Sequence, residues 1–434
     1  MRPNRSTSLM LLLLAGLFLI GCDTTLNIKS PAKNYYIKYF GNEGSQTGID
    51  FVINSDGTIV LFGTTQLAVG DPRFYLAKAD ASGNLLWERT FGSKCQARDV
   101  ELASDGRIVI LGNMVNPTPG RTDYDILLMT VGQDGKTVDS VGLFGYTNNN
   151  NGAPANEDAS AVTQTQDGGF VIAGSSDNLT HSAISGVLRD ALFIRVNSDL
   201  SPYSSSWQDP PAYGKGIENV STKIIQLPDA SFIFFGYARF SSDAILNNDF
   251  NFWVFPLSTD GGTPTSGEQT YGSPNSDEKL GSVAAYASGF FLGGVTTNNN
   301  TQADSTYILQ LRSPLQFDGT DKQNQTPKSM GSTLGKPVEH TSVLASPGSG
   351  YFLLTNDFST TNSNIRLTKI TANAVPGLST VYGGPGDDFA GAVQELPDGR
   401  ILIVGTMAVG QPSINNGETK VVLIKVNKDG QFSD

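Results

Sequence analysis

The amino-acid sequence predicts an all-β fold, a seven-bladed β-propeller whose blades each contain four antiparallel strands. Three observations lead to this prediction. Glycine supplies 48 of the 434 residues, about 11% against an average of about 7%, which is typical of a chain with many tight turns. An aromatic residue followed by glycine recurs along the chain. Between these pairs, short apolar runs alternate with turn sequences, as expected for repeated antiparallel strands.

The aromatic–glycine pair marks the repeat. Its glycines lie 51 to 69 residues apart, and with the stretch that follows the last pair they define seven units. The pairs are Phe40-Gly41, Phe91-Gly92, Phe144-Gly145, Tyr213-Gly214, Tyr271-Gly272 and Tyr382-Gly383, and Met330-Gly331 occupies the remaining place. A regular spacing of this length is typical of propeller blades.

The elements follow the same order within each unit. A first run carries small residues, such as 390–393, and suits the crowded centre of a ring. A tight turn follows, such as Asp56-Gly57 or Asp398-Gly399, which favours a hairpin because both residues tolerate positive φ. Second strands are expected at 59–63, 108–112, 170–174, 232–236 and 401–405, and usually end at glycine. Third strands are expected at 74–79, 126–131, 192–196, 307–311, 365–370 and 421–426, and fourth strands at positions such as 85–90.

The two ends of the repeat region predict how the ring closes. The last unit reaches its third strand at 421–426 and turns at Asp429-Gly430, and only four residues follow. Residues 35–39 (Tyr-Tyr-Ile-Lys-Tyr) precede the first aromatic–glycine pair, where a fourth strand belongs. We therefore expect the N-terminal strand to complete the seventh blade, which would pair both open edges. The propeller is assigned to residues 34–434.

The repeat resembles one found in bacterial lipoproteins and secreted proteins of the Bacteroidetes type. That pattern runs roughly G-x-x-x-x-D, then D-G-G-[FY]-[IV]-[IV]-A-G, then G-N-x-x-W-x-x-[FY]-G, and segments 383–405, 167–174 and 83–92 match it. The resemblance implies a propeller over about 34–434. It implies no catalytic residues, since the family has no single activity. Unit six departs from the pattern because Gly348-Ser349-Gly350 replaces the Asp-Gly turn and Thr355 replaces the glycine that ends the second strand.

Residues 1–21 have the features of a signal peptide. Arg2 and Arg5 precede an apolar run at 9–20, which is too short to span a bilayer comfortably. The run ends in Leu-Ile-Gly before Cys22, which resembles the lipobox of bacterial lipoproteins. The resemblance implies cleavage before Cys22, attachment of acyl chains such as palmitate there, and a lipidated linker over 22–33. An ordinary secretory signal with a chance cysteine is the alternative.

The net charge and the expected location in the cell narrow the class of partner. The chain has 29 Lys and Arg against 41 Asp and Glu, a net charge of −12. This balance argues against nucleic acid, whose recognition needs clustered basic residues. We expect a monomeric propeller anchored by lipid to a membrane of the bacterial cell envelope, the outer membrane rather than the inner one. Asp23 resembles the inner-membrane retention signal of enteric bacteria, so the membrane stays open at this stage.

Propeller geometry separates two faces. The tight turns between first and second strands and between third and fourth strands share one face, termed the turn face. The longer loops and the links between blades share the other, termed the loop face, where binding is expected. Candidate partner-binding residues there are Glu157, Asp158, Asp277, Glu278, Glu339, Asp387, Asp388, Trp207 and Tyr237, and the same links carry Asp50, Asp99, Arg98 and Lys223. Capping of backbone amides is the alternative role for the carboxylates.

The sequence offers few residues for catalysis. His181 and His340 are the only histidines, and the chain contains no G-x-S-x-G, H-E-x-x-H or P-loop motif. With Cys22 lipidated, Cys95 is the one thiol left, and we expect it to be a small buried residue. We predict no catalytic residue, metal or cofactor. The predicted function is a lipid-anchored binding or scaffold module for a protein or a glycan. The alternative is an envelope hydrolase or lyase that uses carboxylates at the channel mouth.

Overall fold

The computed structural model describes residues 35–146, 154–177, 189–203, 217–239, 249–260, 267–286, 289–312, 322–328, 341–346, 350–358, 362–371, 375–409 and 417–433, with the backbone alone at 303, 322–328 and 341–346. Residues 35 to 434 form one compact unit. Within the described ranges all regular structure is β-strand. None of these residues belongs to a helix that is long and apolar enough to cross a membrane.

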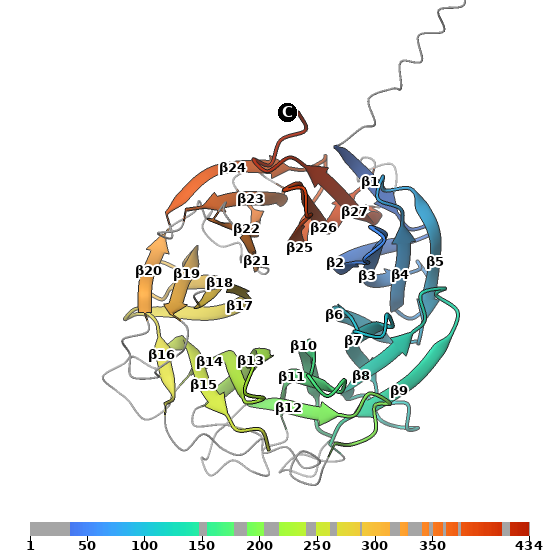
Figure 1. Cartoon of the computed structure of the whole chain (residues 1–434), viewed down its shortest axis with the longest axis horizontal. Coiled ribbons are helices and arrows are strands. Elements are labelled where there is room, and N and C mark those ends of the chain that lie inside the picture. Colours follow the sequence, from blue (N-terminus) through green and yellow to red (C-terminus); the bar gives the residue numbers. More distant parts are fainter. Residues whose placement is uncertain are drawn as a thin grey trace, which may run out of the picture. The chain divides into compact units, whose positions relative to one another are not determined.

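Seven antiparallel sheets surround a central opening (Figure 1), which confirms the predicted propeller. Blade 1 contains β2 (Ser45–Ile53), β3 (Ile59–Gln66), β4 (Arg73–Ala79) and β5 (Leu85–Phe91). Blade 2 contains β6 (Cys95–Leu102), β7 (Ile108–Val115), β8 (Tyr124–Val131) and β9 (Val138–Phe144). Blade 3 has three strands among the described residues, β10 (Glu157–Gln164), β11 (Phe170–Ser176) and β12 (Asp190–Val196).

The remaining blades follow the same order from the axis outward. Blade 4 contains β13 (Glu218–Gln226), β14 (Phe232–Arg239), β15 (Phe250–Leu257) and β16 (Gln269–Tyr271). Blade 5 contains β17 (Ser276–Tyr286), β18 (Gly289–Asn298), β19 (Ala303–Arg312) and β20 (Lys322–Lys328). Blade 6 contains β21 (Thr341–Ser346), β22 (Gly350–Asp357), β23 (Asn364–Ile370) and β24 (Pro376–Tyr382). Blade 7 contains β25 (Phe389–Glu395), β26 (Ile401–Ala408) and β27 (Thr419–Val426), and its fourth strand is β1 (Tyr36–Phe40).

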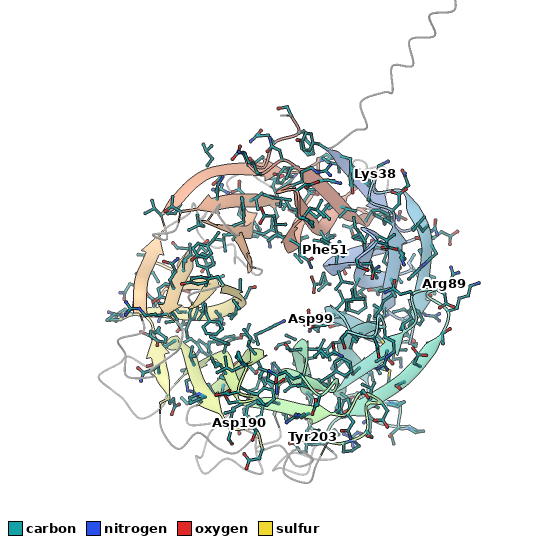
Figure 2. All side chains as sticks on the ribbon, in the orientation of Figure 1. Lys38, Phe51, Arg89, Asp99, Asp190 and Tyr203 are labelled. Carbon is teal, nitrogen blue, oxygen red and sulfur yellow. The ribbon has the colours of Figure 1, made fainter. Side chains whose placement is uncertain are left out.

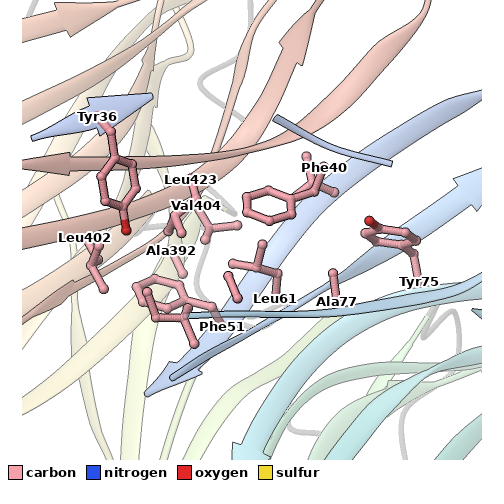
Figure 3. Packing of buried hydrophobic residues seen from close by; sticks show 13 residues of the cluster. Tyr36, Phe40, Phe51, Leu61, Tyr75, Ala77, Ala392, Leu402, Val404 and Leu423 are labelled. Atoms are coloured by element: carbon pink, nitrogen blue, oxygen red, sulfur yellow. The ribbon is translucent and has the colours of Figure 1, made fainter. Parts of the chain in front are cut away.

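The N-terminal strand closes the ring as predicted. β1 pairs antiparallel with β27, with Tyr36 opposite Lys425 and Phe40 opposite Val421. Behind this pairing, a buried cluster joins Tyr36 and Phe40 to Phe51 of blade 1 and to blade 7 (Figure 3). Since strands from both ends of the chain share this cluster, the first and last blades hold each other in place.

The hydrophobic core lies between neighbouring blades rather than in one centre. One cluster, for example, packs Phe62 and Phe74 of blade 1 against Ile110 of blade 2, and the two phenylalanine rings meet edge to face at 5.3 Å. Cys95 belongs to the same cluster as a free, buried thiol, as expected, and burial raises its pKa to about 11. Trp253 lies in β15, the third strand of blade 4, and packs against Phe234, which fits a role in blade packing.

A bulge in the innermost strand explains the glycine of the second strand, which does not end there as expected but continues two to four residues further. In six blades the pairing of first and second strand shifts by one residue beside this glycine. At Gly63 and Gly112 an added Cβ would collide with the carbonyl oxygen of Thr47 or Gln96 across the strand pair. In blade 6, where Thr355 replaces the glycine, Thr341–Ser346 pair with β22 without a shift. The glycine and the bulge therefore occur together.

The residue after this glycine, or after Thr355 in blade 6, ties its blade to the next one. Its side-chain oxygen accepts a hydrogen bond from the first strand of the following blade. These bonds join Ala97 N to Thr64 Oγ1 (2.9 Å), Ala159 N to Asn113 Oδ1 (2.8 Å), Ala390 N to Asn356 Oδ1 (2.7 Å) and Gly48 N to Thr406 Oγ1 (3.0 Å). The last of them crosses the closure between blades 7 and 1, so the tie also operates where the ring closes.

Candidate functional site

Three of the candidate carboxylates are buried where the chain enters a blade. Glu157, Glu278 and Asp388 are each at most 1% exposed. Each lies against the glycine of the preceding aromatic–glycine pair, so that a Cβ on Gly145, Gly272 or Gly383 would meet it. The repeated glycine thus leaves room for a buried acid.

These buried acids are held by hydrogen bonds inside the propeller. Glu157 Oε1 accepts from Ser176 Oγ at 2.6 Å, and Glu278 Oε1 accepts from Thr296 Oγ1 at 2.9 Å. Asp388 accepts from the backbone N–H of Gly384 at 2.6 Å and of Ala408 at 2.9 Å. Burial raises the pKa of Glu157 and of Glu278 to about 7, and it also raises the pKa of Asp388. These contacts fix each acid to the second strand of its own blade, and in Asp388 also to the link that leads into the blade.

Two other candidates cap backbone amides of the preceding blade. Asp277 Oδ1 accepts from Phe250 N at 2.9 Å, at the start of β15. Asp387 Oδ1 accepts from Ser363 N at 2.8 Å, just before β23. Asp387 is exposed and Asp277 is half-buried. The capping role considered for these carboxylates is therefore seen at both positions.

Asp158 and Tyr237 come together in a cavity at the central channel. The cavity has a volume of about 590 Å³ and collects side chains from blades 1 to 5 and 7. Asp158 accepts a hydrogen bond from Asn113 and forms ion pairs with Arg98 (3.1 Å) and Arg189 (3.5 Å). The Tyr237 hydroxyl lies in the field of Asp158 and Arg189, and burial raises its pKa to about 12. These residues flank the loop face, because β10 begins there and β14 ends there.

The bulges decide which side chains line the channel. The bulged residue and its successor are Ile49 and Asp50 in blade 1, Arg98 and Asp99 in blade 2, Ser160 and Ala161 in blade 3, Thr222 and Lys223 in blade 4, Gly281 and Ser282 in blade 5, and Gly391 and Ala392 in blade 7. All of these residues line the cavity. At these positions blades 1, 2 and 4 thus present charged groups, while blades 3, 5 and 7 present small residues.

Deeper in the channel, Asp50 and Asp99 share a hydrogen bond. Burial, and then the charge of Asp99, raise the pKa of Asp50 well above its usual range. Asp99 Oδ2 accepts from Val162 N at 2.7 Å and lies 4.0 Å from Lys223 Nζ. Further along the same face of β6, burial raises the pKa of Glu101 to about 7. Figure 2 shows Asp99 at the inner edge of the ring.

The channel is a better candidate site than a larger hollow of about 940 Å³ beside blade 1. That hollow is lined by residues of one blade and the links around it, including the exposed Leu67 and Val69. The channel instead gathers ionised groups from separate blades into one space. Convergent polar groups around a concave space are what distinguishes a binding site from a surface groove.

The sequence patterns pointed to part of this site. Asp158 and Tyr237 were among the candidates, and Asp50, Asp99, Arg98 and Lys223 were noted only as charged residues of the blade links. Arg189 was missed because it precedes β12 without any motif of its own. Alignment of the units on the residue opposite the second-strand glycine would have placed Asp50, Asp99 and Lys223 in register. Cys22, Trp207, Glu339, His181 and His340 lie outside the described residues.

The described residues contain no group of three or more His, Cys, Asp or Glu side chains that could hold a metal ion. No family model matches the sequence, and no curated protein matches it.

Solved structures are similar to this chain at low identity. A protein of unknown function from Dyadobacter fermentans is 12% identical with a TM-score of 0.46, covering 90% of this chain and 99% of that one. The GH93 α-L-arabinofuranosidase of Fusarium graminearum is 14% identical with a TM-score of 0.48, covering 91% and 98%. Virginiamycin B lyase from Staphylococcus aureus is 10% identical with a TM-score of 0.45, covering 90% and 99%. At these identities and TM-scores we take no ligand or activity from them, so the chain is described here by its fold, a seven-bladed β-propeller.

Proposed function

We propose that this protein is a lipid-anchored binding module of the bacterial cell envelope that holds a protein or a glycan at the loop-face mouth of its central channel. The observation that carries the proposal is the cavity of about 590 Å³, in which Arg98, Asp158 and Arg189 converge from different strands. A concave site with a few convergent polar groups is the usual form of a ligand pocket.

The chain enters the propeller at the turn face, on the side away from the proposed binding site. β1 begins at the turn face, where Lys38 Nζ donates a hydrogen bond to Asn84 Oδ1 at 3.4 Å, in the turn between β4 and β5. β1 then runs to the loop face, where Lys420 Nζ donates to Gly44 O at 2.8 Å. A tether between Cys22 and Asn34 reaches at most about 45 Å. A lipid on Cys22 would therefore tether the protein through the end of β1 that lies at the turn face.

The proposal is tested by filling the channel without changing its charges. Ser282→Trp places a large side chain in the cavity, and Ser82→Trp makes the same change on the exposed turn between β4 and β5 as a matched control. The lipidated wild type and both variants are purified from gently crosslinked membranes. A protein or glycan that accompanies the wild type and Ser82→Trp, and is lost with Ser282→Trp, would support the proposal. A partner retained equally by all three would exclude the channel as the binding site.

A hydrolase or lyase remains the second candidate because burial raises the pKa of Asp50, which lines the channel, and of Glu101, further along β6. The pKa of Asp50 is raised well above its usual range and that of Glu101 to about 7, which suits a general acid. The direct hydrogen bond between Asp50 and Asp99, however, brings them closer than the spacing of about 5 Å or more that glycosidases use. Release of new reducing ends from envelope polysaccharide by the wild type, abolished in Asp50→Asn, would establish the enzyme instead.

A further inference from the structure

From the distribution of charge in the channel, we infer that its ligand is the end of an acidic glycan, with a sugar carboxylate against Arg98 and Arg189 and sugar hydroxyls on Asp50, Asp99 and Lys223. This inference rests on the proposed binding function and names the class of ligand.

Two partly exposed guanidinium groups converge at the mouth of the channel. Asp158 pairs with both Arg98 and Arg189, at 3.1 and 3.5 Å. Both arginines are about one-third exposed, at 35% and 32%, so a ligand can reach them. Guanidinium groups bind carboxylates through paired hydrogen bonds, so this pair of arginines favours an acidic group on the ligand.

The deeper part of the channel is rich in hydrogen-bonding groups. Asp50 and Asp99 share a hydrogen bond, and Lys223 Nζ lies 4.0 Å from Asp99 Oδ2. A region that offers both donors and acceptors suits hydroxyl groups, since each hydroxyl both donates and accepts.

Small residues supply space for a sugar ring. Gly281, Ser282, Gly391 and Ala392 line the channel in blades 5 and 7. Their small side chains leave a volume within the range of about 300–1,000 Å³ that ligand pockets occupy. Tyr237 adds an aromatic ring at the mouth, held edge to face against Phe250 at 5.6 Å.

A purely structural role explains part of this arrangement. Asp50 Oδ1 accepts from Phe51 N at 2.8 Å, and Asp99 bridges to Val162 N in the next blade, so both carboxylates satisfy amides beside the bulges. Blades 3, 5 and 7 carry Ala161, Ser282 and Ala392 at the same position and keep the bulge. The bulge therefore does not require a charged residue, and the concentration of charge on blades 1, 2 and 4 is left for a ligand.

The test measures binding of oligosaccharides to the full-length lipidated protein in detergent. The probes are galacturonate, mannuronate and glucuronate-containing oligosaccharides, with neutral galactose oligomers of equal length, in calorimetry at pH 6.5. We expect the wild type to bind at least one acidic series at least about tenfold more tightly than the neutral series. Arg98→Gln with Arg189→Gln should remove that preference, a loss of about tenfold or more. Asp158→Asn should strengthen acidic binding because it releases both guanidinium groups.

Controls and opposing results separate the inference from the function on which it rests. Arg73→Gln, an exposed arginine of blade 1 outside the channel, should bind as the wild type does. Equal binding of neutral and acidic probes would overturn the acidic class while the binding function stands. A partner captured by crosslinking but no binding to any saccharide would overturn the glycan inference alone. If the double arginine variant does not fold, weaker acidic binding by Asp158→Asn would overturn the inference on its own. The failure of both experiments would reject the proposed function as well.

Discussion

Replacement of Glu157 by glutamine should make the propeller more stable at neutral and alkaline pH and leave it nearly unchanged near pH 5. Glu157 is 1% exposed, and burial raises its pKa from 4.5 to about 7. Glutamine keeps the hydrogen-bonding geometry, since its oxygen can accept from Tyr146 N and its amide can donate to Ser176 Oγ. The substitution therefore removes the buried charge with little change in shape.

The sign and size of the effect follow from proton linkage. Between pH 4.5 and 7 the folded state binds more protons at Glu157 than the unfolded state does, so the wild type loses stability as the pH rises. Each unit of pKa difference is worth about 1.4 kcal/mol. At pH 5 the penalty is under about 1 kcal/mol, and at pH 8 it reaches about 3 kcal/mol. The variant should gain roughly 2.5 kcal/mol on the wild type between these two pH values.

Urea denaturation at pH 5, 6, 7 and 8 measures this difference directly. Glu43→Gln, an exposed glutamate in the link that leads into blade 1, is the matched control and should show no such gain. The Coulomb effect of Asp125 on Glu157 is part of the measured value, since Asp125 contributes to the raised pKa. If the wild type and Glu157→Gln differ by the same amount at every pH, Glu157 is not a buried carboxyl of raised pKa and the reasoning is wrong.

Three further predictions concern the ring and its anchor. Thr406→Val removes the oxygen that accepts from Gly48 N and should lower the free energy of unfolding in urea by about 1–3 kcal/mol. The control Thr47→Val changes an exposed threonine of β2 and should lower it by less than about 0.5 kcal/mol. Gly405→Ala directs a Cβ at the carbonyl oxygen of Phe389 and should lower the urea midpoint; an unchanged midpoint would show that the bulge does not need glycine. Cys22→Ala should shift the protein from the membrane fraction to the soluble fraction, and retention at the wild-type level would rule out lipid attachment at Cys22.

Most of the fold could be predicted because its determinants are local and repeated. Asp-Gly turns, aromatic–glycine pairs and apolar runs recur in each unit, and each feature acts on residues close to it in the chain. The closing strand was also predictable, since the last unit lacks a fourth strand and residues 35–39 supply one. Thr355 marked the one blade in which the first and second strands pair without a bulge.

The candidate site was less predictable because it depends on register and on the closure of the ring. Glu157, Glu278 and Asp388 looked like surface carboxylates, but each turns inward against a glycine that belongs to the preceding repeat. Asp50, Asp99 and Lys223 are far apart in the chain and meet only because bulges in three separate strands direct them toward one axis. The sequence by itself determined the blades, their number and their order, through interactions within each repeat. Only the tertiary structure decided which charges share the channel, because that depends on contacts between blades that no local pattern encodes.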